Sequence, residues 1–148
     1  MRLPLVGLAL LAALPLGAQD RVPTAADTVR ANLAIARSDL RNLVVAQERY
    51  FSDHGRYAPH LDSMKALYVP SRGSAMVLTV ARTDGWAAKL TRERLGGSCI
   101  IWVHVPESDR PKTSRDGLQG REGEPVCDPQ PETQGTSGAA TPSRPPRR

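Results

Sequence analysis

A regular apolar stripe between Thr24 and Ser52 constrains the fold of this chain more than any other feature of the sequence. Successive members lie four or three residues apart, which keeps them on one face of an α-helix. Thr24 suits the N-cap position, and Gly55 is placed to end the helix. We therefore predict one continuous helix over Ala25–Phe51, about 40 Å long. The stripe consists of Val29, Leu33, Ala36, Leu40, Leu43, Gln47 and Tyr50, widened by Val44 and Phe51.

Three strand-like runs follow the helix, at residues 74–82, 86–94 and 99–105. The pairs Asp84-Gly85 and Gly96-Gly97 separate them and are strong tight-turn signals. A fourth short strand is expected around Val126 and Cys127. The pattern predicts an α+β fold, with a long N-terminal helix packed on a three- to four-stranded antiparallel sheet. Residues 56–73 are predicted to be a connection with a short amphipathic piece, and residues 106–124 a long exposed loop.

The first eighteen residues have the layout of a secretory signal peptide. A basic start is followed by the apolar run Leu3–Leu16 and then by Gly17-Ala18. Fourteen helical residues span about 21 Å, which is short for a bilayer core of roughly 30 Å. We predict cleavage after Ala18, no stable membrane span afterwards, and export to the periplasm, cell surface or medium. An uncleaved apolar anchor is the alternative.

Residues 129–148 are rich in Pro, Gly, Ser, Thr and Gln and contain no bulky apolar residue. Such a composition predicts a disordered tail, which leaves residues 19–128 as one small domain. The net charge of +5 arises partly from the two ends. No basic run in the body is interleaved with aromatic residues, so we expect no nucleic-acid partner.

Cys99 and Cys127 are the two cysteines of the chain. An even number of cysteines in an exported protein favours a disulfide bond. A metal site built on two cysteines is the alternative, but no further ligands stand at metal-binding spacing.

Sequence motifs of catalysis are absent. The chain has no HExxH, GxSxG, GxGxxG or Walker-type motif, and His54, His60 and His104 are not spaced like metal ligands. We therefore expect no enzymatic activity and no cofactor. The three histidines are expected to be exposed polar residues, and Trp86 and Trp102 to pack in the core.

Several short motifs resemble the globular region of type IV pilins and pseudopilins. They are AQERYFSDHGRYAPHLDSM at the end of the helix, YVPSRG, TDGWAAKL and the late GEPVC. In that family the helix commonly ends in an aromatic pair followed by a polar-Gly turn and a tyrosine, and the matching residues are Tyr50, Phe51, Asp53, Gly55 and Tyr57. The resemblance extends from about Leu40 to Cys127. It implies a structural or interaction role in a pilus or a type II secretion system.

The N-terminal part of the chain departs from the filament-forming members of that family. They start with a basic leader ending in Gly, followed by a cleavage junction and an apolar helix with an early Glu. Here the run Leu3–Leu16 has no acidic residue, and residues 19–23 separate it from the predicted helix. We expect a pilin-type head carried by a secretory signal. In pilins the first half of the helix extends beyond the head, which implies that Val29, Leu33 and Ala36 form a partly exposed docking stripe for a protein partner or a second copy.

Five acidic residues crowd the segment around Cys127. Some pseudopilins hold calcium in this region, so the resemblance suggests a calcium site here. The spacing matches no EF-hand loop, and four basic residues lie among the acidic ones. A solvated, charge-balanced loop is the alternative. The calcium candidates are Asp109, Asp116, Glu122, Glu124 and Asp128.

Two classes of function agree with these observations. The first is an exported, non-catalytic pilin-like module for assembly, adhesion or secretion. The second is an extracellular protein that binds a small ligand or a polyanion such as DNA.

Overall fold

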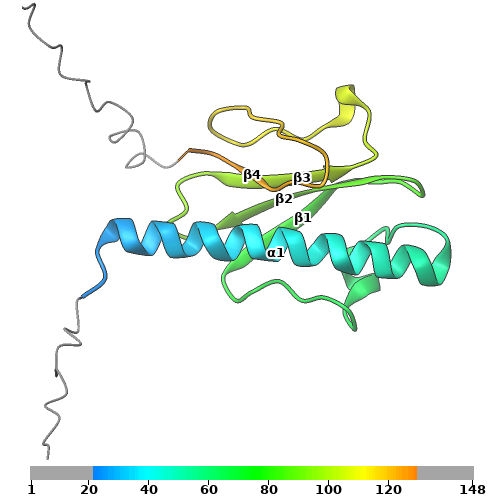
Figure 1. Ribbon diagram of the computed structural model, residues 1–148, viewed down its shortest axis with the longest axis horizontal. Helices are drawn as coiled ribbons and strands as arrows, with labels where there is room; N and C mark the ends of the chain where they lie inside the picture. Colours follow the sequence, from blue (N-terminus) through cyan, green and yellow to red (C-terminus); the bar gives the residue numbers. More distant parts are fainter. Residues whose placement is uncertain (1–21, 130–148) are drawn as a thin grey trace, which may run out of the picture.

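The computed structural model describes residues 22–129 and confirms the α+β class, with one helix lying across a four-stranded antiparallel sheet (Figure 1). The predicted signal peptide, residues 1–18, and the predicted tail from residue 130 onward lie outside the described residues. Two short 3-10 helices, Leu61–Met64 (η1) and Glu107–Asp109 (η2), lie in the connections. The main elements are α1 (Ala25–His54), β1 (Ser74–Ala81), β2 (Trp86–Arg92), β3 (Ser98–Val103) and β4 (Val126–Cys127).

Helix α1 begins and ends at the residues that the sequence indicates. The backbone N–H of Asp27 donates to Oγ1 of Thr24 at 3.1 Å, and the backbone N–H of Thr24 donates to Oδ2 of Asp27 at 3.0 Å. This reciprocal pair satisfies two backbone donors that the first turn leaves open. Gly55 ends the helix with a φ of 68°, and its N–H donates to the carbonyl of Phe51 at 2.7 Å. The helix is three residues longer than predicted.

The sheet has the order β1-β2-β3-β4, and every neighbouring pair is antiparallel. Tight turns join β1 to β2 and β2 to β3, as the two glycine-containing pairs predict. Each of the three predicted strands is one or two residues shorter at its C-terminal end than expected. The fourth strand is confirmed, and it pairs with β3.

The main core lies between α1 and one face of the sheet. Helix residues such as Leu40 and Leu43 meet Trp86, Leu90 and Ile101, which project from that face. Gln47 is also fully buried, and it accepts a hydrogen bond from the backbone N–H of Ala58 at 2.8 Å. This bond fixes the chain after the helix against the helix itself.

A second, smaller core lies on the opposite face of the sheet. Because side chains alternate along a strand, Ala87 and Trp102 point away from α1, and they pack with Val105. The segment between β3 and β4 covers this face. The indole N–H of Trp102 donates to the carbonyl of Gln119 at 2.9 Å, and the guanidinium of Arg110 lies 4.0 Å from the ring centre of Trp102. The predicted long exposed loop is confirmed for most of residues 106–124, of which only Thr113 is buried, but the segment also packs on Trp102.

Candidate functional site

The two halves of the α1 stripe are buried to different degrees. Leu40 and Leu43 are fully enclosed in the main core, whereas Val29 and Leu33 are only half-buried, with Leu33 packed against the edge of that core. No residue of the segment 25–35 is fully buried. The first turns of α1 reach past the end of the sheet (Figure 1). Half-covered apolar side chains therefore lie at the N-terminal end of the helix.

Ala36 does not belong to an exposed stripe. Its side chain is 0 % exposed and is part of the main core. The prediction that Ala36 is partly exposed is therefore wrong, because the sheet covers α1 one turn earlier than the family resemblance implies. The exposed part of the predicted docking stripe is reduced to Val29 and Leu33.

A buried carboxylate on α1 escaped the sequence analysis. Asp39 is 3 % exposed and accepts hydrogen bonds from the hydroxyls of Ser71 and Ser74 at 2.6 and 2.5 Å. The backbone N–H of Ser71 also donates to it at 3.3 Å. These bonds hold the entrance of β1 on the helix. Its position three residues after Ala36 and four before Leu43 places Asp39 on the buried face, which is the sequence signal that could have revealed it.

Exposed apolar side chains gather beside Asp39. A groove of about 450 Å³ runs between α1 and residues 67–71. Val45 and Val69, which line it, are 69 % and 73 % exposed. Neither residue belongs to the predicted stripe. Val45 lies on a different face of the helix, and Val69 lies in the connection before β1.

The two cysteines are joined in the structure, as predicted. Cys99 on β3 and Cys127 on β4 form a disulfide bond and stand directly opposite each other in the strand register. The bond closes the chain around the covering segment between β3 and β4.

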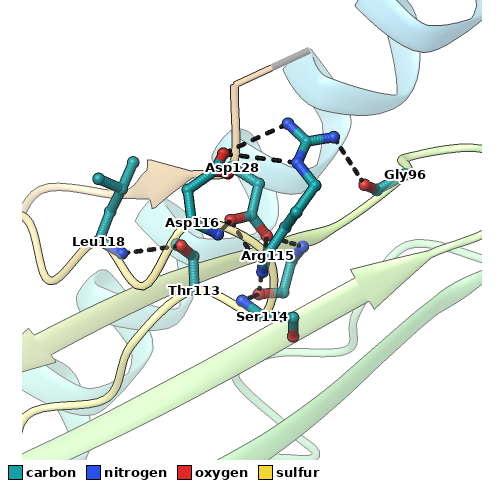
Figure 2. A network of polar contacts seen from close by, with 8 residues as sticks. Gly96, Thr113, Ser114, Arg115, Asp116, Leu118 and Asp128 are labelled. Atoms are coloured by element: carbon teal, nitrogen blue, oxygen red, sulfur yellow. Dashed lines mark hydrogen bonds and ion pairs between the residues drawn. The ribbon is translucent and has the colours of Figure 1, made fainter. Parts of the chain in front are cut away.

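Asp128, directly after the disulfide, is the centre of a network of hydrogen bonds (Figure 2). Its side chain is 1 % exposed, and the backbone N–H groups of Ser98, Arg115 and Asp116 donate to it at 2.8, 3.1 and 2.8 Å. Burial alone would raise the pKa of Asp128. The hydrogen bonds from the Thr113 side chain and from these three N–H groups outweigh burial and lower the pKa to about 2. Asp128 is therefore a charged anchor for the covering segment.

The five calcium candidates do not come together as a metal site. Asp109 pairs with Arg82 at 3.5 Å, Asp116 with Arg115 at 3.4 Å, and Glu122 with His104 at 3.5 Å. Glu124 is exposed. Backbone N–H groups donate to the Asp128 carboxylate and stabilise its negative charge. The same N–H dipoles disfavour a cation bound beside it. Among residues 22–129 no group of three or more His, Cys, Asp or Glu side chains could hold a metal ion.

The histidines are exposed and stand apart, as predicted. His54 stacks on Tyr50 with ring centres 4.0 Å apart, and His104 pairs with Glu122. Trp86 and Trp102 are both buried, which confirms core packing, and the indole N–H of Trp86 has no hydrogen-bond partner among the described residues. In the same part of the chain, no helix combines the length and apolar character needed to cross a bilayer.

No protein-family model matches this chain, and no curated protein sequence is significantly similar to it.

Proposed function

We propose that this protein is an exported, non-catalytic interaction module with a pilin-like head, acting in the cell envelope or outside the cell. The observation that supports this is the unequal burial of α1. From Leu40 onward the stripe lies in the core, whereas Val29 and Leu33 remain half-buried and the segment 25–35 contains no fully buried residue. The arrangement of one long helix followed by an antiparallel sheet agrees with the resemblance to pilins.

The half-buried residues at the N-terminal end of the stripe can contribute apolar contact area to a binding partner. Apolar surface left in contact with water is unfavourable by about 25 cal/mol per Å². An apolar surface on another protein relieves that cost, and a helix presents such residues to a groove at steps of three and four. Val29 and Leu33 have this spacing. The partner is accordingly a protein with a complementary apolar surface.

Serine substitutions separate binding from folding. Val29→Ser and Leu33→Ser should lower the free energy of unfolding by less than Leu43→Ala, which truncates a fully buried side chain and should cost about 2–4 kcal/mol. The same serine variants should weaken capture of a partner from envelope or secreted fractions, and any self-association measured by sedimentation. Val45→Ser is the matched control, because Val45 is exposed on the same helix but lies outside the stripe.

Two outcomes would contradict the proposal. If Leu33→Ser destabilises the domain as much as Leu43→Ala, the whole stripe is core and no docking surface exists. If Val45→Ser weakens capture as much as Leu33→Ser, the effect is not specific to the stripe. Capture that falls steeply with salt would favour the alternative, a polyanion-binding protein.

A further inference from the structure

Three arginines line a single cleft at the N-terminal half of α1. The cleft has a volume of about 380 Å³, and Arg72, Arg92 and Arg94 line it together with Asn32 and Thr28 from the helix. Arg72 precedes β1, Arg92 ends β2, and Arg94 lies in the turn after β2. Residues far apart in the sequence therefore contribute three arginines to one cleft.

In the described part of the chain, no carboxylate pairs directly with the arginines of this cleft, and the nearest link to one is the Ser74 hydroxyl between Arg92 and Asp39. Glu93 also lines the cleft, so the lining carries a formal net charge of +2. Within residues 22–129 no carboxylate lies within ion-pair distance of Arg72, Arg92 or Arg94. In contrast, Arg30, Arg49 and Arg115 each pair with one carboxylate, and Arg82 pairs with two.

Neutral hydrogen-bond acceptors hold the central arginine in place. Nε of Arg92 donates to Oδ1 of Asn32 at 3.3 Å, and Nη1 donates to the hydroxyl oxygen of Ser74 at 2.5 Å. Ser74 in turn donates to the buried carboxylate of Asp39. A guanidinium carries five N–H donors, so these two bonds orient Arg92 and leave donors for a ligand. A group oriented in advance loses less conformational entropy when it binds.

Two residues that line the cleft have left-handed backbone conformations. Arg94 has a φ of 59°, in the left-handed region that non-glycine residues rarely adopt. Gly73 has a φ of 82°, and a Cβ atom there would lie 3.7 Å from Nη2 of Arg92. That distance is an ordinary van der Waals contact, so the positive φ is what favours glycine at position 73.

From these observations we propose that the cleft binds a phosphate-class oxyanion, a site additional to the interaction surface above. A guanidinium fork matches two oxygens of a phosphate or a carboxylate. One arginine satisfies the two oxygens of a carboxylate, whereas several arginines around one point suit the larger number of oxygens and the double charge of a phosphate. The phosphate group is either free in solution or the monoester headgroup of a lipid such as phosphatidic acid, which keeps the three terminal oxygens and the second negative charge.

Titration of the exported full-length protein with inorganic phosphate at pH 7 tests the site. Saturable binding by calorimetry is expected, with amide shift changes in NMR spectra concentrated at Gly73 and residues 92–94. Arg72→Gln and Arg94→Gln should each raise the Kd for phosphate about tenfold. A tenfold change corresponds to about 1.4 kcal/mol, and a hydrogen bond between charged groups contributes at least that much. Arg37→Gln is the matched control, since Arg37 is exposed on α1, carries the same charge and does not line the cleft. It should bind phosphate as the unmodified protein does.

Vesicles distinguish the two sources of phosphate. Binding to phosphatidic acid vesicles, but not to phosphatidylcholine vesicles, that is lost in Arg94→Gln and kept in Arg37→Gln would assign the site to a lipid headgroup. Binding of inorganic phosphate without vesicle binding would assign it to a soluble ligand. The proposal is overturned if phosphate binding is not saturable, if acetate binds as tightly as phosphate, or if Arg37→Gln loses as much affinity as Arg94→Gln. None of these results depends on whether Leu33 docks a partner.

Discussion

Asp128, directly after β4, holds the segment between β3 and β4 against the rest of the domain. It receives backbone donors from β3 and from residues 115 and 116, so one carboxylate joins two distant parts of the chain. Gly97 permits this arrangement by close approach, because a Cβ atom there would lie 2.6 Å from Oδ2 of Asp128. Any larger residue at position 97 would displace the anchor.

The lowered pKa of Asp128 predicts a loss of stability in acid. The unfolded chain binds the proton near the ordinary pKa of 3.8, whereas the folded protein binds it only near 2. Protonation therefore favours the unfolded state as the pH falls from about 5 towards 2, and the linked loss in the free energy of unfolding is about 2 kcal/mol. Denaturant unfolding at a series of pH values should show this loss reduced in Asp128→Asn.

Asp62→Asn is the control for that experiment, because the Asp62 side chain is highly exposed. It should retain the acid dependence of the unmodified protein. If Asp128→Asn keeps the full dependence, Asp128 is not the group that titrates.

At the scale of the element, local sequence signals determine the ends of α1, and packing on the sheet determines which of its residues are buried. The capping box and Gly55 determine where the helix begins and ends. The sheet determines which of its turns are buried, from Ala36 onward. The same helix thus serves as core at one end and as half-open surface at the other.

Replacing Gly55 isolates the local contribution to α1. A Cβ atom at Gly55 would have no neighbour within 4 Å, so only the left-handed backbone conformation opposes substitution. Gly55→Ala should lower the free energy of unfolding by about 1 kcal/mol. Gly55→Asn should lose less, because asparagine tolerates this conformation better. Thermal or denaturant unfolding measures both, and equal losses would show that the conformation is not the cause.

For the whole molecule, the disulfide bond joins the end of the described chain to the centre of the sheet. Replacing Cys99 and Cys127 together by Ser should lower the free energy of unfolding by about 3–4 kcal/mol, from the chain entropy of closing a loop whose ends are 28 positions apart. The helix content should persist in circular dichroism, since α1 has its own caps and core. Hydrogen exchange should rise mainly in residues 106–127. Two free thiols in native exported protein, found by peptide mapping, would contradict the pairing.

Export of the whole chain is a separate prediction. The apolar run Leu3–Leu16 followed by Gly17-Ala18 predicts a mature protein that begins at Gln19. Intact-mass measurement of material recovered outside the cytoplasm should show the loss of residues 1–18. A mass that retains them would contradict the secretory signal.

The sequence by itself determined the elements and their order. Helical periodicity, the Thr24 cap, Gly55 and the two tight turns are local signals, because caps and turns depend on residues a few positions apart. The cysteine count and the apparent export signal likewise indicated the disulfide. These features needed no knowledge of distant contacts.

The tertiary structure alone decided what each surface faces. Ala36 is buried because the sheet reaches it, and Asp39 finds Ser71 and Ser74, which lie more than thirty residues away. The segment between β3 and β4 is mostly exposed, as predicted, but one side of it covers Trp102. Asp128 accepts hydrogen bonds from backbone N–H groups instead of joining a calcium cluster. The arginine cleft likewise unites residues from a loop, a strand and a turn. Burial and long-range hydrogen bonding depend on which segments meet in space, and a local pattern of residues carries little information about that.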